Sequence, residues 1–220
     1  MPPRGRGGRV VSDLRPRLLD LCCGAGGAAH GYRLAGWHVT GVDLVAQPNY
    51  CGDVFVQADA LEYLSEHGRS FDAIHASWPC EKFANVTGAT GDRATHPDLV
   101  TPGRPLLVAS GRPWVIENVP EAPIRAHYLL CGSMFGLHVR RHRAFETSWS
   151  GGPRLTPPCW HHRDLVPFDH SRERAYADAM GCTWMTNKEA RKAIPPAYTH
   201  HIGTDLIDAL TTRAREETAA

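Results

Sequence analysis

The chain has 220 residues and a formal net charge of +1, and 42% of its residues are hydrophobic and 21% charged. This length allows one well-buried domain with a small appendage and excludes two full-sized enzyme domains. No stretch approaches the roughly 20 consecutive apolar residues that span a bilayer, so a membrane-embedded function is excluded. Segment 1–9 is rich in Arg and Gly and lacks the apolar core of a secretory signal. We therefore expect a solvated basic tail over 1–16 and a cytoplasmic protein.

The cysteines and arginines carry more information than the overall charge. Seven cysteines without a repeating interval, two of them adjacent at 22 and 23, argue against a disulfide framework. They suit a reducing compartment in which one thiol reacts. Arginines cluster locally at 140, 141, 143 and 154. Charge alone favours nucleic-acid contact and a plain solvated surface equally.

The first half of the sequence alternates short apolar runs with segments of helical length. We expect strands at 17–23, 38–43, 54–58, 71–76 and 114–117, and helices at 28–35 and 106–110. Strands joined by helices predict an α/β fold, with a doubly wound, mostly parallel, Rossmann-like sheet. The connection from 80 to 101 is polar and broken by glycine and proline, and a connection this long is usually a functional loop.

The second half begins with frequent prolines and glycines after Arg143, which predict little regular structure. Helices are expected at 172–180, at 187–193 and from 204 onward, with Thr204 as the N-cap of the last. The predicted organisation is a core at 17–148, a reduced appendage at 149–185 and C-terminal helices at 186–220 that complete the core.

A glycine cluster follows the first predicted strand. Gly24, Gly26 and Gly27 would let the backbone approach a ligand closely, with helix N-terminal amides pointing at it. Their spacing is tighter than the dinucleotide fingerprint, which favours another nucleoside-bearing cofactor over nicotinamide. Asp43 ends the second strand and would bind ribose hydroxyls, and Asp59 follows the third and would bind an adenine amino group. Each acid could instead cap a turn or a helix.

Cys80 follows the fourth predicted strand, within the segment Ser-Trp-Pro-Cys-Glu at 77–81. It should therefore lie at the same sheet edge as the glycine cluster. Most free cysteines are buried and inert. A Pro-Cys pair that opens a long polar loop instead indicates a reactive thiol.

Taken together, these motifs resemble those of the DNA cytosine-5 methyltransferases, in particular the short members found in phage genomes. Segment 20–27 is similar to the family's cofactor-binding turn, with Cys22 where the family has an aromatic residue. Segment 78–81 is similar to the family's Pro-Pro-Cys-Gln nucleophile motif, and segment 117–119 matches its Glu-Asn-Val motif. Segment 141–143 keeps the family's Arg-x-Arg motif. Segment 194–196 keeps the Ile-Pro-Pro part of its C-terminal element. The resemblance runs from about 17 to about 210.

The resemblance implies S-adenosylmethionine as cofactor and double-stranded DNA as substrate. We further expect a monomer without membrane contact, in a bacterial or phage-infected cytoplasm. The implied cofactor-binding residues are Asp20, Cys22, Gly24, Gly26, Gly27, Asp43, Leu44, Asp59, Ala60 and Pro79. The implied catalytic residues are Cys80, Glu117, Arg143 and Arg141.

The chemistry explains these residue types. Carbon 5 of cytosine accepts a methyl group only after a nucleophile has added to carbon 6, which a thiolate of Cys80 would do. Glu117 would hydrogen-bond ring nitrogen 3 and the exocyclic amine, and its carboxyl must then carry a proton, so we predict a pKa raised by burial. Arg143 would hold the oxygen at position 2 and Glu117 itself, and Arg141 would support the site or contact phosphate.

A base inside a stacked duplex is out of reach, so the target must flip out while the 81–100 loop closes over it. Asn85, Thr87 and Arg93 are the candidates in this loop for filling the gap or touching phosphate. Arg140 and Arg154 are further DNA-binding candidates. A solvated loop without contacts is the alternative for each.

Three departures from the family matter. Trp78 replaces a proline and predicts a reshaped base pocket, and Arg191-Lys192 replaces a Gly-Asn pair near the cofactor. Only about 45 residues separate Arg143 from Arg191, where the family carries a target-recognition domain. We expect a short or relaxed recognition sequence of roughly one to three base pairs.

Cys159, His161 and His162 suggest a zinc site completed by Cys182 or Cys131. Their Cys-x-His-His spacing fits no standard closed site, so we expect no metal and favour a loop that binds DNA through His and Arg. Two other functions stay open: methylation of RNA such as a tRNA loop, and a non-catalytic DNA-binding remnant of the fold. The intact Cys80, Glu117 and Arg143 argue against the remnant.

Overall fold

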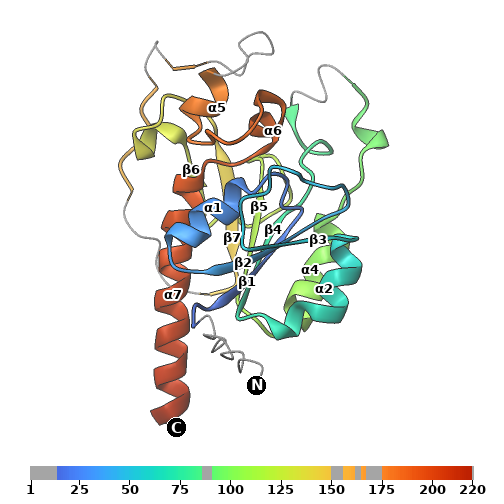
Figure 1. Ribbon diagram of the computed structural model, residues 1–220, viewed down its shortest axis with the longest axis vertical. Coiled ribbons are helices and arrows are strands. Elements are labelled where there is room, and N and C mark those ends of the chain that lie inside the picture. The colour runs from blue at the N-terminus through green and yellow to red at the C-terminus, as the bar shows by residue number, and fades with distance from the viewer. Residues whose placement is uncertain (1–13, 86–90, 150–155, 162–164, 167–174, 220) are drawn as a thin grey trace, which may run out of the picture.

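The computed structural model describes residues 14–85, 91–149, 156–161, 165–166 and 175–219 (Figure 1). Its centre is a seven-stranded sheet in the order β3-β2-β1-β4-β5-β7-β6. The strands are β1 (Arg17–Leu21), β2 (His38–Asp43), β3 (Val54–Gln57), β4 (Ala73–Ser77), β5 (Trp114–Asn118), β6 (Tyr128–Leu130) and β7 (Arg143–Thr147). The first five pair in parallel, and β7 runs antiparallel between β5 and β6. The predicted doubly wound, mostly parallel α/β sheet is confirmed.

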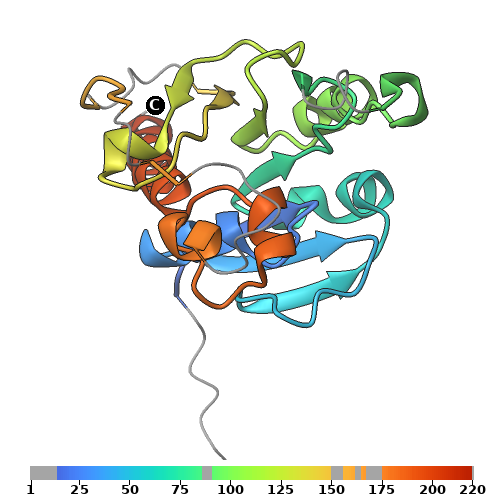
Figure 2. The ribbon, with the colours of Figure 1, turned by 90° about the horizontal axis from the view of Figure 1, so that it is seen from above.

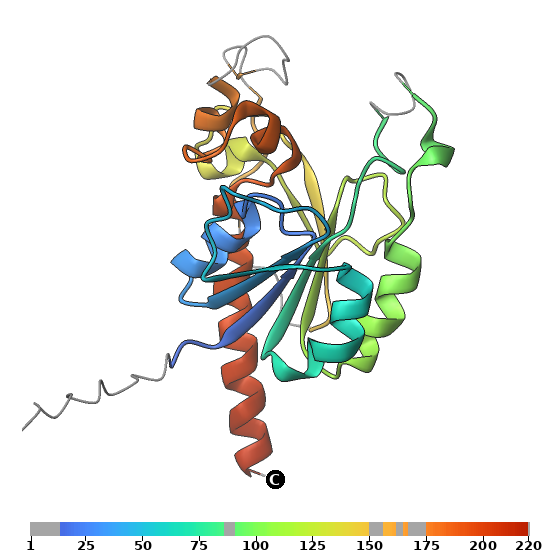
Figure 3. The same cartoon turned by 45° about the vertical axis from the view of Figure 1, so that its right-hand side comes forward.

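Helices cover both faces of the sheet. Figure 3 shows α1 (Gly27–Leu34) and α7 (Pro196–Ala219) on one face, and α2 (Ala60–His67) and α4 (Val100–Ala109) on the other. Successive side chains of β1 alternate between the two layers, so Leu18 packs with Tyr32 and Tyr198 while Leu19 packs with Leu64 and other residues of the opposite layer. This alternation of two apolar layers around β1 builds the core.

Short elements gather above the carboxyl edge of the parallel strands. They are α5 (Ala175–Ala179), α6 (Asn187–Lys192) and the 3-10 helix η3 (Gly132–Phe135), while η1 (Gly68–Ser70) and η2 (Arg93–Thr95) lie in other connections. Tyr176, Met180 and Met185 form a third apolar cluster with Ala25 and Val139. The described end of the predicted appendage therefore packs on the core, directly over the first glycine turn, as the view from above indicates (Figure 2).

Several element boundaries differ from the predictions. α7 begins at Pro196, so Thr204 is not an N-cap but lies inside the helix, where its hydroxyl donates to the carbonyl of His200. Proline is favoured in the first turn of a helix because it has no N–H to leave unpaired. α4 begins at Val100, earlier than expected, and contains Pro105 in its interior. The strands β6 and β7 were not predicted at all, and 172–174 lie outside the described residues.

Within the part of the chain that the structure describes, none of the helices combines the length and apolarity needed to cross a lipid bilayer.

Candidate active site

The strand order reverses between β1 and β4, which are neighbours although two strands separate them in sequence. In open α/β sheets, ligands bind outside the carboxyl ends of the strands at such a switch point. The glycine turn follows β1 and Cys80 follows β4. The topology thus places the two strongest sequence motifs on either side of this point.

The glycine turn has an unusual backbone. Cys22, Gly24 and Gly26 have positive φ angles of 57°, 49° and 88°. Gly26 also lacks space for a side chain, since an added Cβ would lie 2.9 Å from Sγ of Cys51. Asp43 fixes the turn from β2, because its Oδ2 accepts a hydrogen bond from the Gly24 amide at 3.0 Å.

The C-terminal region closes over this turn. A Cβ at Gly27 would lie 2.5 Å from the carbonyl oxygen of Ile194, so glycine is required for the two segments to approach. The indole of Trp184 donates to the Ala25 carbonyl at 2.9 Å and stacks near His30. The sequence analysis missed Trp184, because no local pattern in its segment pointed to the turn.

Asp20 is fully buried at the end of β1, and neither of its carboxylate oxygens has a hydrogen-bond partner among the described residues. Burial raises the pKa of Asp20 well above its usual value and the nearby charges of Asp43 and Glu117 raise it further, while the nearby Ala29 backbone amide opposes the rise without making a hydrogen bond of normal geometry. A buried carboxyl group without a hydrogen-bond partner lowers the stability of the folded protein, unless a ligand supplies a hydrogen-bond donor or a positive charge. Asp20 was predicted only to bind the cofactor, and that stays a prediction.

The other predicted cofactor residues lie at the ends of β2 and β3. Asp43 is half-buried, and its Oδ1 also accepts from the Val45 amide at 3.1 Å. Leu44 is 67% exposed although apolar, which suits a surface that stacks on a ring. Asp59 is exposed and is the N-cap of α2, accepting from the amides of Leu61 and Glu62. Asp59 can therefore cap α2 and also bind a ligand, since the cap occupies only its Oδ1 atom.

Ala60 is buried as the first residue of α2, and Pro79 is half-buried directly before Cys80. Cys80 itself is half-buried, and its carbonyl accepts the amides of Phe83 and Ala84, each at 2.9 Å, which turns the chain sharply after β4. The side-chain amide of Asn118 donates to the carbonyl of Trp78 at 3.0 Å. The Glu-Asn-Val segment thereby fixes the turn that presents Cys80.

The sequence analysis predicted that Trp78 reshapes the base pocket. The structure instead places its side chain in the core. Its side chain is 1% exposed and belongs to the core layer under α4. A Cβ at Gly103 of α4 would lie 2.4 Å from the indole. The large ring points into the core because alternate residues at this strand end still face the helical layer.

Glu117 and Arg143 form the charged centre of the site. Glu117 is the second-last residue of β5 and pairs with Ser77 of β4, and Arg143 begins β7. The Nε of Arg143 lies 3.0 Å from Oε1 of Glu117, and both side chains are nearly buried. Burial raises the pKa of Glu117 despite the opposing charges of Arg143 and Arg141, which is the direction predicted from the sequence.

Cys80 lies within electrostatic range of this pair. Burial raises the pKa of the Cys80 thiol, the positive charge of Arg143 opposes that rise, and the negative charge of Glu117 adds to it. The structure therefore places a thiol, an acid and a cation near one another: Cys80 after β4, Glu117 in β5 and Arg143 at the start of β7.

Arg141 has a supporting position. Its guanidinium donates to the hydroxyl of Tyr176 at 3.0 Å and to the carbonyl of Arg191 at 2.8 Å, and its own carbonyl accepts from Tyr198. Arg141 thereby joins α5, α6 and α7 beside the site. Of its two predicted roles, this geometry favours support over phosphate contact.

The DNA-binding candidates are only partly described. Arg93 donates to Asn85 and to the carbonyl of Ala84, each at 3.1 Å, and Asn85 donates to Glu121. Asn85 and Arg93 thus link the two described parts of the 81–100 loop, and both are exposed. Arg140 is exposed beside the site, whereas Thr87 and Arg154 lie outside the described residues.

Neither the protein-family models nor the curated proteins contain a match to this chain. Among solved structures, it is similar to a DNA modification methyltransferase candidate encoded within a prophage of E. coli, at 20% identity and a TM-score of 0.43, over 59% of this chain and 45% of the other. It is also similar to the Dnmt2 methyltransferase of S. pombe, at 16% identity and a TM-score of 0.45, over 73% and 63%. The methyltransferase EhMeth of Entamoeba histolytica matches at 15% identity and a TM-score of 0.42, over 71% and 55%. In each case less than two thirds of the other chain is covered.

Proposed function

We propose that this protein is an S-adenosylmethionine-dependent methyltransferase that methylates carbon 5 of cytosine in double-stranded DNA through a covalent bond to Cys80. The observation that carries the proposal is the convergence of Cys80, Glu117 and Arg143 from the ends of β4, β5 and β7, beside the glycine turn. A thiol, a buried acid and a paired arginine are the groups that activation of a pyrimidine ring requires.

The cofactor fits the other half of the site. The glycine turn, with its left-handed backbone, leads into the start of α1, and Asp43 lies beside it at the end of β2. The buried carboxyl of Asp20 has no partner among the described residues and would receive the ammonium group. Leu44 offers an exposed apolar surface for the adenine ring. When bound there, the cofactor supplies an electrophilic methyl group.

Cys80 would start the reaction as a thiolate, forming a bond from Sγ to carbon 6 of a flipped-out cytosine. Electron density then moves through the ring toward nitrogen 3, where a protonated Glu117 donates a hydrogen bond. Burial favours this protonated state, because it raises the pKa of Glu117. Arg143 holds the Glu117 carboxyl at 3.0 Å and would hold the oxygen at position 2 of the ring.

After the methyl group has been transferred, the proton on carbon 5 must leave to a base, for which water is sufficient. The electron pair of that C–H bond re-forms the ring double bond, and the bond between carbon 6 and Sγ of Cys80 breaks. The thiolate is then restored.

The proposal is tested by trapping the covalent bond. A duplex oligonucleotide that contains 5-fluorocytosine cannot lose a proton from carbon 5, so it should remain attached to the wild-type protein when S-adenosylmethionine is present. Cys80→Ser should give no adduct, although it retains the fold. If the wild type forms no adduct on any duplex of mixed sequence, the proposal is overturned.

The substrate is tested separately. Bisulfite sequencing of DNA from cells that express the wild type should show methylcytosine that is absent with Cys80→Ser, and it would report the sequence context. Methyl transfer to purified tRNA in place of duplex DNA would retain the chemistry and replace the substrate. Methylation of neither nucleic acid would favour a non-catalytic remnant.

A further inference from the structure

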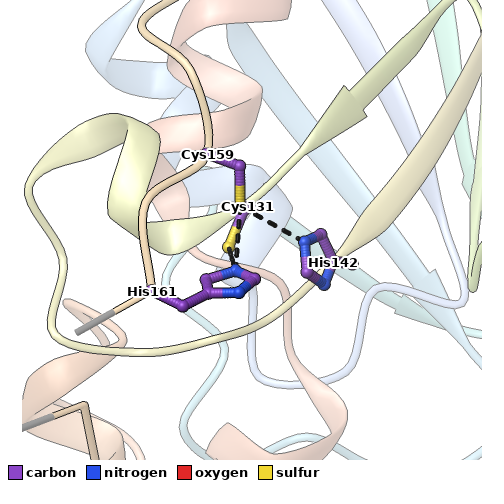
Figure 4. Close-up of side chains that lie close together, drawn as sticks. All are labelled: Cys131, His142, Cys159 and His161. Carbon is purple, nitrogen blue, oxygen red and sulfur yellow. Dashed lines mark hydrogen bonds between the residues drawn. The ribbon is translucent and has the colours of Figure 1, made fainter. Parts of the chain in front are cut away.

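Four side chains that bind zinc in other proteins meet at the side of the sheet that carries β6 and β7. They are Cys131, His142, Cys159 and His161, which we call the Cys2His2 cluster (Figure 4). One ligand atom from each residue lies within 4.8 Å of every other. Three separate segments supply them: the end of β6, the residue before β7 and the stretch 156–161.

We propose that the Cys2His2 cluster binds one zinc ion with four protein ligands, and that this ion fastens segment 156–161 to the β6–β7 end of the sheet. None of its four residues takes part in the proposed methyl transfer. The proposal rests on the positions of four side chains, not on the sequence spacing that had led us to expect no metal.

The distances agree with a tetrahedral ion. Zinc bonds of about 2.3 Å to sulfur and about 2.0 Å to nitrogen place neighbouring sulfur and nitrogen ligands roughly 3.5 Å apart. Nε2 of His161 lies 3.4 Å from Sγ of Cys131, and Nε2 of His142 lies 3.4 Å from Sγ of Cys159. A third sulfur–nitrogen pair, Cys159 and His161, lies at 2.8 Å and would have to move apart toward that value, and the fourth, Cys131 and His142, lies within 4.8 Å.

The surroundings of the sulfur atoms also suit coordination. The hydroxyl of Ser133 lies 3.6 Å from Sγ of Cys131 and 3.6 Å from Sγ of Cys159, so one donor reaches both sulfurs. Two thiolates balance the double charge of the ion, and the two thiol protons pass to solvent on binding. With four protein ligands the site has no open position, which is the arrangement of structural zinc and not of catalytic zinc.

Without a metal, the same contacts would stabilise little. Cys159 and His161 are exposed, and hydrogen bonds between neutral groups in contact with water contribute about 1 kcal/mol or less each. Such contacts do not account for the convergence of two sulfurs and two imidazoles from three segments. A disulfide between Cys131 and Cys159 would use the sulfurs but give no role to the two histidines.

The position of the site gives it a consequence for the proposed active site. His142 directly precedes Arg143, whose guanidinium pairs with Glu117. A zinc ion on His142 would fix the start of β7 from one side, while Arg141 fixes it from the other through Tyr176 and Arg191. The zinc would therefore position Arg143 without touching any reacting atom.

The test is the metal content of the untagged full chain, purified after expression in zinc-supplemented medium. Elemental analysis should find about one zinc per chain in the wild type, as a single closed site requires. Cys159→Ser and His161→Ala should each lower zinc affinity by at least roughly 10–100-fold. That is the loss seen when only a hydrogen-bond partner of a metal ligand is changed, and here a ligand itself is removed. Cys159→His keeps a ligand at the same position and should retain zinc.

Two control variants separate this site from other thiols and histidines. Cys80→Ser should retain zinc while it loses the covalent adduct with DNA, so failure of the proposed function and failure of the zinc site give different results. His200→Ala removes an exposed histidine outside the cluster and should also retain zinc.

A spectroscopic measurement on the wild type tests the site even if the variants fold poorly. Cobalt(II) added to the metal-free wild type should give the intense visible bands of a tetrahedral ion together with thiolate charge-transfer absorption. The proposal is overturned if the wild type contains no zinc and shows no such bands. It is equally overturned if zinc remains in both Cys159→Ser and His161→Ala, or if mass spectrometry finds Cys131 and Cys159 joined as a disulfide in freshly purified protein.

Discussion

Asn118 holds the backbone of Trp78 with a hydrogen bond of 3.0 Å from its side-chain amide to the Trp78 carbonyl. Its side-chain oxygen accepts from the Val119 amide at 2.9 Å. One buried side chain thus joins the end of β5 to the turn after β4. The position of the Cys80 thiol depends on this link, because only Pro79 separates Cys80 from Trp78.

Asn118→Asp should slow adduct formation on 5-fluorocytosine DNA by about 100-fold, since a misplacement of about 1 Å costs that much. The aspartate keeps the acceptor for Val119 and loses the donor to Trp78. Cofactor affinity, measured by calorimetry, should change little, because the glycine turn lies on another strand. A variant that reacts at the wild-type rate would show that Asn118 does not position Cys80.

The charges of Arg143 and Glu117 should act on Cys80 in opposite directions. Arg143 lowers the pKa of Cys80 and Glu117 raises it, within an overall rise above the ordinary value of 9.0 that burial causes. Arg143→Gln should therefore move the alkylation midpoint of Cys80 to higher pH, and Glu117→Gln should move it to lower pH. The measurement is the rate of iodoacetamide labelling of the Cys80 peptide, followed by mass spectrometry.

Arg140→Gln is the matched control, since it removes a positive charge from an exposed position near the same strand. It should leave the midpoint unchanged. Equal shifts in Arg140→Gln and Arg143→Gln would mean that the general charge of the segment acts on Cys80, and not the Arg143 side chain.

His75 should make the folded protein sensitive to acid. It is fully buried between the hydroxyls of Tyr32 and Ser77, and burial lowers its pKa to about 3. An unfolded histidine takes up its proton near pH 6.5, so the unfolded state binds more protons between these values and stability falls as pH falls. Between pH 7 and pH 5 this single group should cost about 2 kcal/mol of unfolding free energy.

His75→Gln keeps a donor and an acceptor but does not titrate. Its unfolding free energy, measured with urea at several pH values, should fall less between pH 7 and pH 5 than that of the wild type. The exposed His200→Gln should behave as the wild type. Parallel pH curves for the wild type and His75→Gln would contradict the prediction.

The contact between α1 and α7 should not tolerate a side chain at Gly31. An added Cβ would lie 2.1 Å from the Pro196 carbonyl oxygen and 2.1 Å from Oγ1 of Thr199. Gly31→Ala should lower the free energy of unfolding by about 1–3 kcal/mol, because overpacking outweighs the better helix propensity of alanine. Thermal and urea unfolding measure this change.

Leu34→Ala on the same helix removes a side chain that is 62% exposed and should change stability by less than about 0.5 kcal/mol. If Gly31→Ala is as stable as the wild type, α1 and α7 must lie further apart than the structure places them.

The sequence by itself determined the parallel half of the sheet and the positions of its motifs. The range 38–43 was predicted for a strand and is β2, and the glycine turn and Cys80 were placed at one sheet edge. These inferences succeeded because apolar runs of strand length, ended by glycine or acidic residues, are local signals. In a parallel sheet the carboxyl ends of the strands share one edge, so local order alone brings those motifs together.

The tertiary structure alone decided where β7 lies, which way Trp78 points and which cysteines and histidines meet. β7 inserts between β5 and β6, which sets Phe145 opposite Glu117 and brings Arg143 to the same carboxyl. Trp78 faces the core against Gly103. Cys131 and His142 join Cys159 and His161 only because β6 and β7 pair. Each of these contacts joins segments that are far apart in the chain. The local sequence pattern of one segment predicts its secondary structure but not which distant segment it will contact.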